Sequence, residues 1–262
     1  MESQNLQKPL AGRTVLISGG GTGIGKGIAL AFAKAGAAVA LCGRRAEPLE
    51  AAAAEIKKLG GQAVAIIADV TKAEDCRRVV AETLQKLGSL HTLVNNAGIA
   101  RHGALADTSD ADIASILDTN VKGVMLLTKY AIPELAKHVG TKTDASVLII
   151  ASSVVNKPIN NFSVYSAAKA AVVHFARCMA LDLSPQRIRV NCINPGVVET
   201  PIFGTMMPSA AVDQAMEMYA KATPLGRVGQ PDDIAQAALY LSNPHSNWVT
   251  GAVLTVDGGI GL

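Results

Sequence analysis

The sequence has few aromatic residues, little net charge and no run of basic residues. Aromatic residues make up 3% of the 262 residues, and the formal net charge is +3. A surface that binds nucleic acid needs clustered Lys and Arg, and single strands are usually held by aromatic stacking as well. Lys and Arg are instead spread along the chain. We therefore expect no nucleic-acid partner.

The cysteines and histidines are also few and scattered. The chain has four Cys and five His, without a Cys-x-x-Cys pair or a typical ligand spacing. This pattern argues against a disulfide framework and against a metal site, and it favours reduced thiols. No stretch reaches the ~18 uninterrupted apolar residues of a membrane span, and no signal sequence is recognisable. We expect a soluble, cytoplasmic protein without a metal and without a membrane partner.

Short apolar segments alternate with amphipathic segments along the chain. The expected strands are residues 14–18, 38–42, 63–67, 91–95, 146–151, 188–193 and 253–256. The expected helices are residues 26–36, 46–59, 73–87, 110–138, 164–181 and 231–242. This alternation predicts an α/β fold, a Rossmann-type doubly wound sheet of seven parallel strands with helices on both faces. No linker composition divides the chain, so we expect a single domain over residues 1–262, with residues 1–12 frayed.

Residues 196–226 depart from the alternation. They contain three Pro and four Met residues and follow the sixth expected strand. Flexible apolar side chains in a long segment at a strand end are typical of a lid over a binding site. Two ordinary surface helices with a Met-rich face would give a similar pattern, and the position after a strand favours the lid.

A glycine-rich run lies between the first expected strand and the first expected helix. Glycines at this point let the backbone approach a pyrophosphate, and the helix N-terminus offers free N–H groups to it. Ligands of parallel sheets bind beyond the carboxyl ends of the strands, where this run lies. The run therefore predicts a dinucleotide site. Its expected contacts are Gly19, Gly21, Thr22, Gly23, Ile24 and Gly25.

Tyr165 and Lys169 stand four residues apart in the Ala-rich segment 164–181. On a helix they would share one face. A nearby ammonium lowers the pKa of a phenol and would make Tyr165 a better general acid. Such pairs are common on helix surfaces, so this pair does not establish a catalytic site by itself.

Taken together, the motifs resemble the short-chain dehydrogenase/reductase family over nearly the whole chain. The glycine spacing is similar to its Thr-Gly-x-x-x-Gly-x-Gly, with Ser18 in place of Thr, and Tyr165 and Lys169 match its Tyr-x-x-x-Lys. Further matches are Asn95-Asn96-Ala97-Gly98, Asn120, the segment from Asn194 to Thr200, and Val256-Asp257-Gly258-Gly259.

The resemblance implies roles for these residues. Tyr165 would exchange a proton with the substrate oxygen, and Lys169 would hold the nicotinamide ribose and lower the pKa of Tyr165. Asn120 would hold a water that links Lys169 to solvent. Further cofactor contacts implied by the resemblance are Asp69, Val70, Asn96, Ala97, Gly98, Pro195, Gly196, Val198 and Thr200. It also implies a homotetramer built through residues 110–138, residues 164–181 and the C-terminal segment.

The resemblance also implies a serine that binds the substrate oxygen, and two residues compete for this role. The family's usual interval of thirteen residues before the tyrosine points to Ser152. The strand pattern Ala-Ser-Ser-Val instead aligns the family serine with Ser153 and implies a one-residue deletion in the loop 156–163. We expect Ser153, because burial fixes strand register whereas loops absorb deletions.

The cofactor type is predicted from Arg44 and Arg45, which follow the second expected strand. An acidic residue there would bind the ribose 2′-OH of NAD and repel a 2′-phosphate. Arginine suits a phosphate, so we predict NADP(H), with Arg44 as the main contact and Arg45 as the second. The pair could instead be an exposed part of the following helix, and NAD(H) is the less expected cofactor.

The predicted activity is an NADP(H)-dependent interconversion of a ketone and a secondary alcohol, with a small molecule as substrate. A non-catalytic NADPH sensor is the alternative, and the intact Tyr165, Lys169 and Asn120 argue against it. An enoyl reductase is less expected, because such relatives space the tyrosine and lysine more widely. The substrate class stays open between 3-oxoacyl compounds and sugars or polyols. His91 stands where an Asp is common in the family, and we interpret it as structural.

Overall fold

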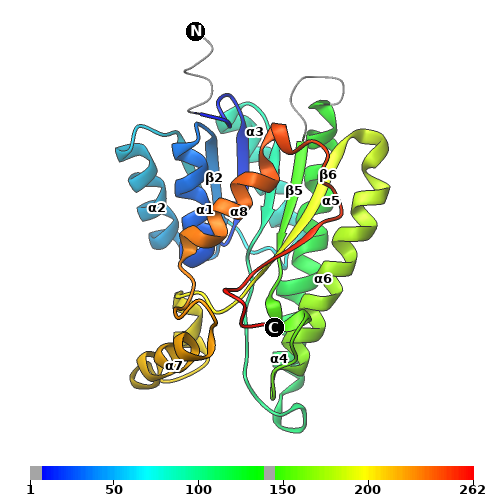
Figure 1. Cartoon of the computed structure of the whole chain (residues 1–262). Coiled ribbons are helices and arrows are strands. Elements are labelled where there is room, and N and C mark those ends of the chain that lie inside the picture. Colours follow the sequence, from blue (N-terminus) through cyan, green and yellow to red (C-terminus); the bar gives the residue numbers. More distant parts are fainter. Residues whose placement is uncertain (1–7, 139–144) are drawn as a thin grey trace.

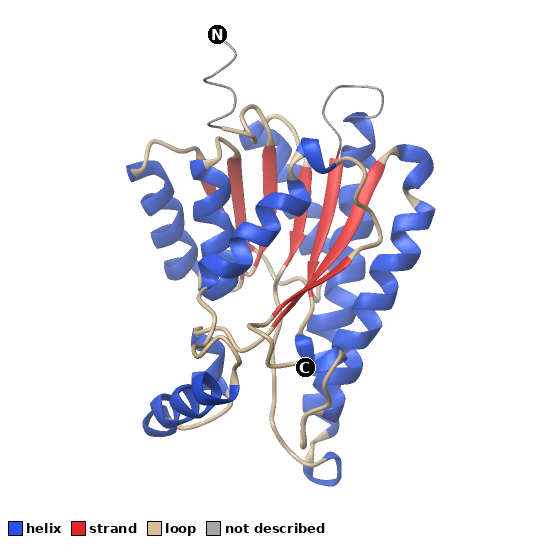
Figure 2. Ribbon diagram, viewed as in Figure 1, coloured by secondary structure: helices blue, strands red, loops and turns tan. Residues whose placement is uncertain are grey.

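The computed structural model describes residues 8–138 and 145–262. It is a parallel sheet between two layers of helices, as Figure 2 shows. The strands are β1 (Thr14–Ser18), β2 (Ala38–Gly43), β3 (Ala63–Ile67), β4 (Thr92–Asn95), β5 (Ala145–Ile150), β6 (Ile188–Pro195) and β7 (Val253–Val256). The α-helices are α1 (Gly23–Lys34), α2 (Ala46–Lys58), α3 (Ala73–Leu87), α4 (Asp110–Leu117), α5 (Gly123–Leu135), α6 (Ser163–Asp182), α7 (Ser209–Ala222) and α8 (Pro231–Ser242).

The strand order is β3-β2-β1-β4-β5-β6-β7, and all neighbouring pairs are parallel. The chain winds outward from β1 in one direction and from β4 in the other. The crevice beyond the carboxyl ends of β1 and β4 is therefore the topological switch point, where ligands of such sheets bind. The predicted Rossmann-type, seven-stranded fold is confirmed.

Adjacent residues of β1 point to opposite faces of the sheet and enter two separate cores. Leu16 packs with residues of α3, α5 and α6, whereas Val15 and Ile17 pack with residues of α1, α2 and α8. Figure 1 shows these two groups of helices on either side of the sheet. All three side chains are fully or almost fully buried. Continuous apolar strands are the pattern expected where both faces are covered.

Residues 8–12 differ from the frayed N-terminus that the sequence indicated. Leu10 is 2% exposed, and its backbone N–H donates to the carbonyl oxygen of Ala35 at 2.9 Å. It packs in the same core as Phe32. One apolar side chain within a polar segment thus secures the entry to β1. Residues 1–7 lie outside the described part of the chain.

The region 110–138, expected to be helical, has a break in its hydrogen-bond pattern. α4 begins after Ser109, whose hydroxyl accepts the backbone N–H of Asp112 at 3.1 Å and caps the helix. Residues Asp118–Lys122 form a π-helical turn, α5 follows, and a 3-10 turn ends the region at His138. Single π-helical turns inside α-helices frequently occur at functional sites. This one contains Asn120.

The side chain of His91 joins β1 to the start of β4. Its Nδ1 accepts the backbone N–H of Thr14 at 3.0 Å, and its ring stacks on that of His138 at 3.9 Å between centroids. Burial, with smaller contributions from His138 and Arg13, lowers the pKa of His91 to about 4. A neutral ring that accepts a backbone N–H is a structural group. It lies at the amino end of the sheet, away from the switch point.

Candidate functional site

The glycine turn after β1 is fastened to the end of β4 by Ser18. The Ser18 hydroxyl accepts the backbone N–H groups of Asn96 and Ala97 at 3.0 and 3.1 Å. The Asn96 side chain returns two hydrogen bonds, to the carbonyl oxygens of Ser18 and Gly19 at 3.0 and 3.2 Å. These contacts need only a hydroxyl group, so Ser18 can form them in place of the family's threonine. The two motifs that were far apart in the sequence are one structural unit.

Close packing explains why glycine is needed in this turn. Gly19 has a φ of +65°, and a Cβ at position 25 would lie 2.3 Å from the Gly19 carbonyl oxygen. Gly23 has a φ of +53° and opens α1, where Thr22 makes no side-chain cap and no acidic residue occupies the first turn. The first N–H groups of α1 are therefore available to an anion. The glycine turn and the first residues of α1 together form a cradle that fits the pyrophosphate of a dinucleotide.

The segment after β6 closes the other side of the cradle. A Cβ at Gly23 would lie 3.0 Å from Cγ2 of Thr200, so this threonine contacts the glycine turn. Gly196 packs so tightly on Asp257 that a Cβ would lie 2.6 Å from its Cα. Pro195 pairs with Val256, and the buried Val198 forms a bridge with Gly229. The motifs after β6 and β7 are thus brought together beside α1.

The residues expected at the adenine end lie at the carboxyl ends of β2 and β3. Arg44 and Arg45 are exposed, and neither forms an ion pair with any residue that the structure describes. Oδ1 of Asp69 accepts the backbone N–H and the hydroxyl of Thr71 at 3.0 and 2.9 Å. Val70 is 8% exposed and would lie 2.8 Å from a Cβ at Gly123. Two arginines next to the glycine turn can meet a phosphate.

Tyr165 and Lys169 share one face of α6, as the spacing predicted. Nζ of Lys169 lies 5.7 Å from the centroid of the Tyr165 ring and donates to the carbonyl oxygen of Ile150 at 2.9 Å. Lys169 is 5% exposed, and burial lowers its pKa to about 8. A lysine with such a pKa can both bind a hydroxyl and exchange a proton near neutral pH.

The pKa of Tyr165 differs from our expectation. We expected Lys169 to lower it, whereas burial raises it to about 12, and only a hydrogen bond with the Ser152 side chain opposes that rise. Lys169 donates instead to the Ile150 carbonyl oxygen, and its Nζ lies 5.7 Å from the centroid of the Tyr165 ring. The phenol is therefore held protonated in this arrangement.

The serine that contacts Tyr165 is Ser152, whereas we expected Ser153. Ser152 has extended backbone angles, with φ of −169° and ψ of 151°, and continues the direction of β5. Ser153 begins a 3-10 turn, Ser153–Val155, so strand alternation no longer applies to it. The thirteen-residue interval to the tyrosine pointed to the serine that forms this hydrogen bond, whereas the strand alignment pointed to Ser153, which lies beyond the end of β5.

Asn120 is fully buried and secures the segment after β4. Its Oδ1 accepts the backbone N–H of Ile99 at 2.9 Å, and its Nδ2 donates to the Ile99 carbonyl oxygen at 2.8 Å. A Cβ at Gly98 would lie 2.8 Å from this Oδ1 and 3.5 Å from Nζ of Lys169. Both ends of the amide are thus engaged by protein backbone. Because Gly98 has no side chain, the side chains of Asn120 and Lys169 can both lie close to it.

Comparison with known proteins places this arrangement in a family. The family described as "Enoyl-(Acyl carrier protein) reductase" matches residues 19–261. The chain is 37% identical over 257 residues to 7alpha-hydroxysteroid dehydrogenase of Escherichia coli K12, covering 98% of this chain and 96% of the relative. The chain belongs to the short-chain dehydrogenase/reductase family.

Other members of the short-chain dehydrogenase/reductase family are similarly close. The 3-oxoacyl-[acyl-carrier-protein] reductase FabG of Thermotoga maritima is 34% identical over 251 residues, covering 96% of this chain and 98% of the relative. The crystal structure of a 3-ketoacyl-(acyl-carrier-protein) reductase from Brucella melitensis, complexed with NADH, superimposes with a TM-score of 0.89 at 35% identity. The superposition covers 97% of this chain and 100% of the Brucella melitensis chain. The chain is therefore an oxidoreductase that acts on hydroxyl or carbonyl groups, with a nicotinamide cofactor.

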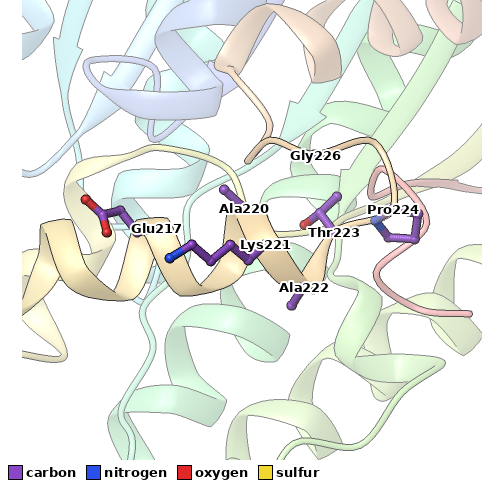
Figure 3. Close-up of a pocket in the computed structure, with 7 residues that line it drawn as sticks. All are labelled: Glu217, Ala220, Lys221, Ala222, Thr223, Pro224 and Gly226. Carbon is purple, nitrogen blue, oxygen red and sulfur yellow. The ribbon is translucent and has the colours of Figure 1, made fainter.

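A separate hollow lies at the C-terminal end of α7, shown in Figure 3. It is lined by Glu217, Ala220, Lys221, Ala222, Thr223, Pro224 and Gly226. All seven lie in the segment 196–226, and Thr223 and Pro224 pack against Gly258 and Gly259 of the C-terminal motif. In the described ranges, no helix is long and apolar enough to cross a membrane, and no cluster of three or more His, Cys, Asp or Glu side chains could hold a metal ion.

Proposed function

We propose that this chain is an NADP(H)-dependent reductase or dehydrogenase that interconverts a ketone and a secondary alcohol. The carrying observation is that Ser152, Tyr165 and Lys169 meet at the carboxyl end of β5, at the same edge of the parallel sheet as the glycine turn. A sensor that only binds NADPH would need the cradle but not a serine in contact with the Tyr165 phenol. The names of the relatives, which are reductases and a dehydrogenase, also favour catalysis.

In this mechanism the protein positions the substrate and handles one proton. The nicotinamide supplies or accepts the hydride. In reduction, the phenol of Tyr165 donates its proton to the substrate oxygen, and the Ser152 hydroxyl binds the same oxygen. A phenol with a raised pKa still gives up this proton, because an alkoxide is a much stronger base than a phenolate. Lys169 would bind the cofactor ribose and return a proton to Tyr165.

The proposed cofactor contacts follow the cradle. Gly19, Gly21, Thr22, Gly23, Ile24 and Gly25 would face the pyrophosphate, and Asp69, Val70, Asn96, Ala97 and Gly98 would line the adenosine and ribose. Pro195, Gly196, Val198 and Thr200 would lie along the nicotinamide. Asn120 supports this wall through the backbone of Ile99. A water held beside Asn120 would link Lys169 to solvent.

We expect Arg44→Asp to reverse the cofactor preference. The unpaired Arg44 would lose a phosphate contact and gain a carboxylate that accepts from a ribose 2′-OH, so the ratio of kcat/KM for NADPH to that for NADH should fall about a hundredfold. Steady-state kinetics with both cofactors measure this ratio. Lys58→Asp, the same charge change at the far end of α2, should leave it unchanged. A wild-type protein that uses NADH better than NADPH would contradict the assignment.

We further propose that residues 196–226 act as the substrate lid. In the part of α7 whose side chains are described, none is buried, and Figure 1 shows the helix standing away from the carboxyl edge of the sheet. Thr200, at the start of the segment, touches the glycine turn. A helix with few buried contacts next to a cofactor cradle is suited to move on binding. We also propose a cytoplasmic location, in which the four cysteines stay free.

We also propose that the chain assembles as a homotetramer. Trp248 is 98% exposed beside the edge strand β7, and Met125 is 40% exposed in an apolar groove of α5. Such patches of exposed apolar surface mark interaction sites. Sedimentation velocity should give about four times the 27.0 kDa chain mass for the wild type. Met125→Glu or Trp248→Glu should give smaller species, whereas Leu59→Glu, at an exposed end of α2, should not; a monomeric wild type would contradict this proposal.

A further inference from the structure

The rings of His102 and Phe162, from two loops, form a row that ends at the ring of Tyr165 in α6. The centroids of His102 and Phe162 lie 5.4 Å apart, and those of Phe162 and Tyr165 also lie 5.4 Å apart, with an edge-to-face angle of 83°. His102 belongs to the loop after β4, and Phe162 directly precedes α6.

The two loops hold this row in place through their backbones. The N–H of Gly103 donates to the carbonyl oxygen of Asn161 at 2.9 Å, which ties one loop to the other. Asn161 has a φ of +59°, a left-handed conformation that asparagine tolerates better than most residues. The backbone carbonyl oxygen of the following residue, Phe162, accepts the N–H of Ser166 at 2.8 Å in the first turn of α6. The Phe162 ring is therefore placed by the same helix turn that carries Tyr165.

The rings leave aromatic surface open at the mouth of the site. His102 is exposed, and Phe162 and Tyr165 are partly exposed. Aromatic residues make up only 3% of the chain, so two of them adjacent at the reacting group are a marked local concentration. Exposed ring faces attract flat or cyclic apolar groups by stacking. An open chain would cover them less completely.

The formally charged side chains of these loops are engaged elsewhere. The loops 99–104 and 153–162 contain one Arg and one Lys and no acidic residue. Nζ of Lys157 donates to the carbonyl oxygen of Ile260 at 2.7 Å in the C-terminal segment. Arg101 donates to the carbonyl oxygen of Ala100 at 3.2 Å and lies 3.5 Å from Oδ1 of Asp112. Lys157 and Arg101 are thus tied to other segments, and a ring rather than either cation lies against Tyr165.

We propose that His102 and Phe162 form an aromatic rim that selects neutral, ring-bearing ketones and the corresponding secondary alcohols. This inference rests on the proposed function, because the selected carbonyl must reach Tyr165. The proposed function leaves the substrate class open, because the catalytic residues do not define it, and the aromatic rim supplies it. Phe162 contacts both the incoming ring and Tyr165, so binding of a ring next to it places the carbonyl beside the phenol.

The test compares α-tetralone, a fused-ring ketone, with 2-decanone, an open-chain ketone of the same carbon count, and with a carboxylate derivative of α-tetralone. We expect the wild type to have the highest kcat/KM for α-tetralone. Phe162→Leu and His102→Ala should each lower the ratio of kcat/KM for α-tetralone to that for 2-decanone about fivefold, as loss of one aromatic contact implies. Phe162→Tyr, which keeps the ring, should retain the ratio.

The control is Phe175→Leu, the same substitution at a partly buried residue of α6 that packs against the core, which should leave the ratio unchanged. Circular dichroism and thermal unfolding check that each variant folds, and the exposed His102 offers a variant with little effect on folding. A ratio that is equal in wild type, Phe162→Leu and His102→Ala, or a wild-type preference for 2-decanone or for the carboxylate, would overturn the rim. No reduction of any carbonyl by the wild type with either cofactor would instead overturn the proposed function.

Discussion

Replacing Tyr165 with phenylalanine is expected to lower kcat for ketone reduction about a thousandfold, because the proton donor is lost. The ring, its edge-to-face contact with Phe162 and the packing of α6 are all retained in this variant. Lys169 keeps its hydrogen bond to Ile150, and the glycine turn is untouched. Binding of NADPH should therefore change little. Steady-state kinetics and a fluorescence titration with NADPH separate the two effects.

Tyr240→Phe is the matched control for this experiment, since Tyr240 is 55% exposed on α8 and distant from the catalytic motif. It should have the activity of the wild type. If Tyr165→Phe reduced ketones at the rate of the wild type, the proton would have to come from another group, and the proposed mechanism would be wrong.

Ser152→Ala is expected to lower kcat about a hundredfold, the usual effect of removing one donor to a reacting oxygen. Ser153→Ala should retain most of the activity, because Ser153 lies in the 3-10 turn and not against Tyr165. The two variants differ from the wild type by the same atom at adjacent positions, so each serves as the control for the other. Measurement of kcat for one ketone with saturating NADPH is sufficient.

The pair of serine variants also has a second readout. The Ser152 hydrogen bond lowers the pKa of Tyr165 against the effect of burial. Its removal should therefore move the alkaline limb of the pH profile of kcat upward in Ser152→Ala and leave it in place in Ser153→Ala. A larger loss of activity in Ser153→Ala than in Ser152→Ala would restore the strand-based assignment.

Most of the fold was predictable because it depends on local patterns. Buried parallel strands have short continuous apolar runs, and helices between them have apolar residues at helical spacing, so β1, β3, β7, α3 and α8 have the predicted bounds. The break around Asn120 was not predictable, because a π-helical turn has the same side-chain chemistry as the α-helix around it. The burial of Leu10 was missed because a single apolar residue has no periodicity.

The order and spacing of the motifs, read from the sequence alone, determined the family, the parallel sheet and the pairing of Tyr165 with Lys169. These features follow from the intervals between residues along one chain. The tertiary structure decided which serine meets the phenol and how the phenol titrates. Both depend on where β5 ends, on burial and on the carbonyl oxygen that Lys169 binds, and these contacts join segments that the sequence keeps apart.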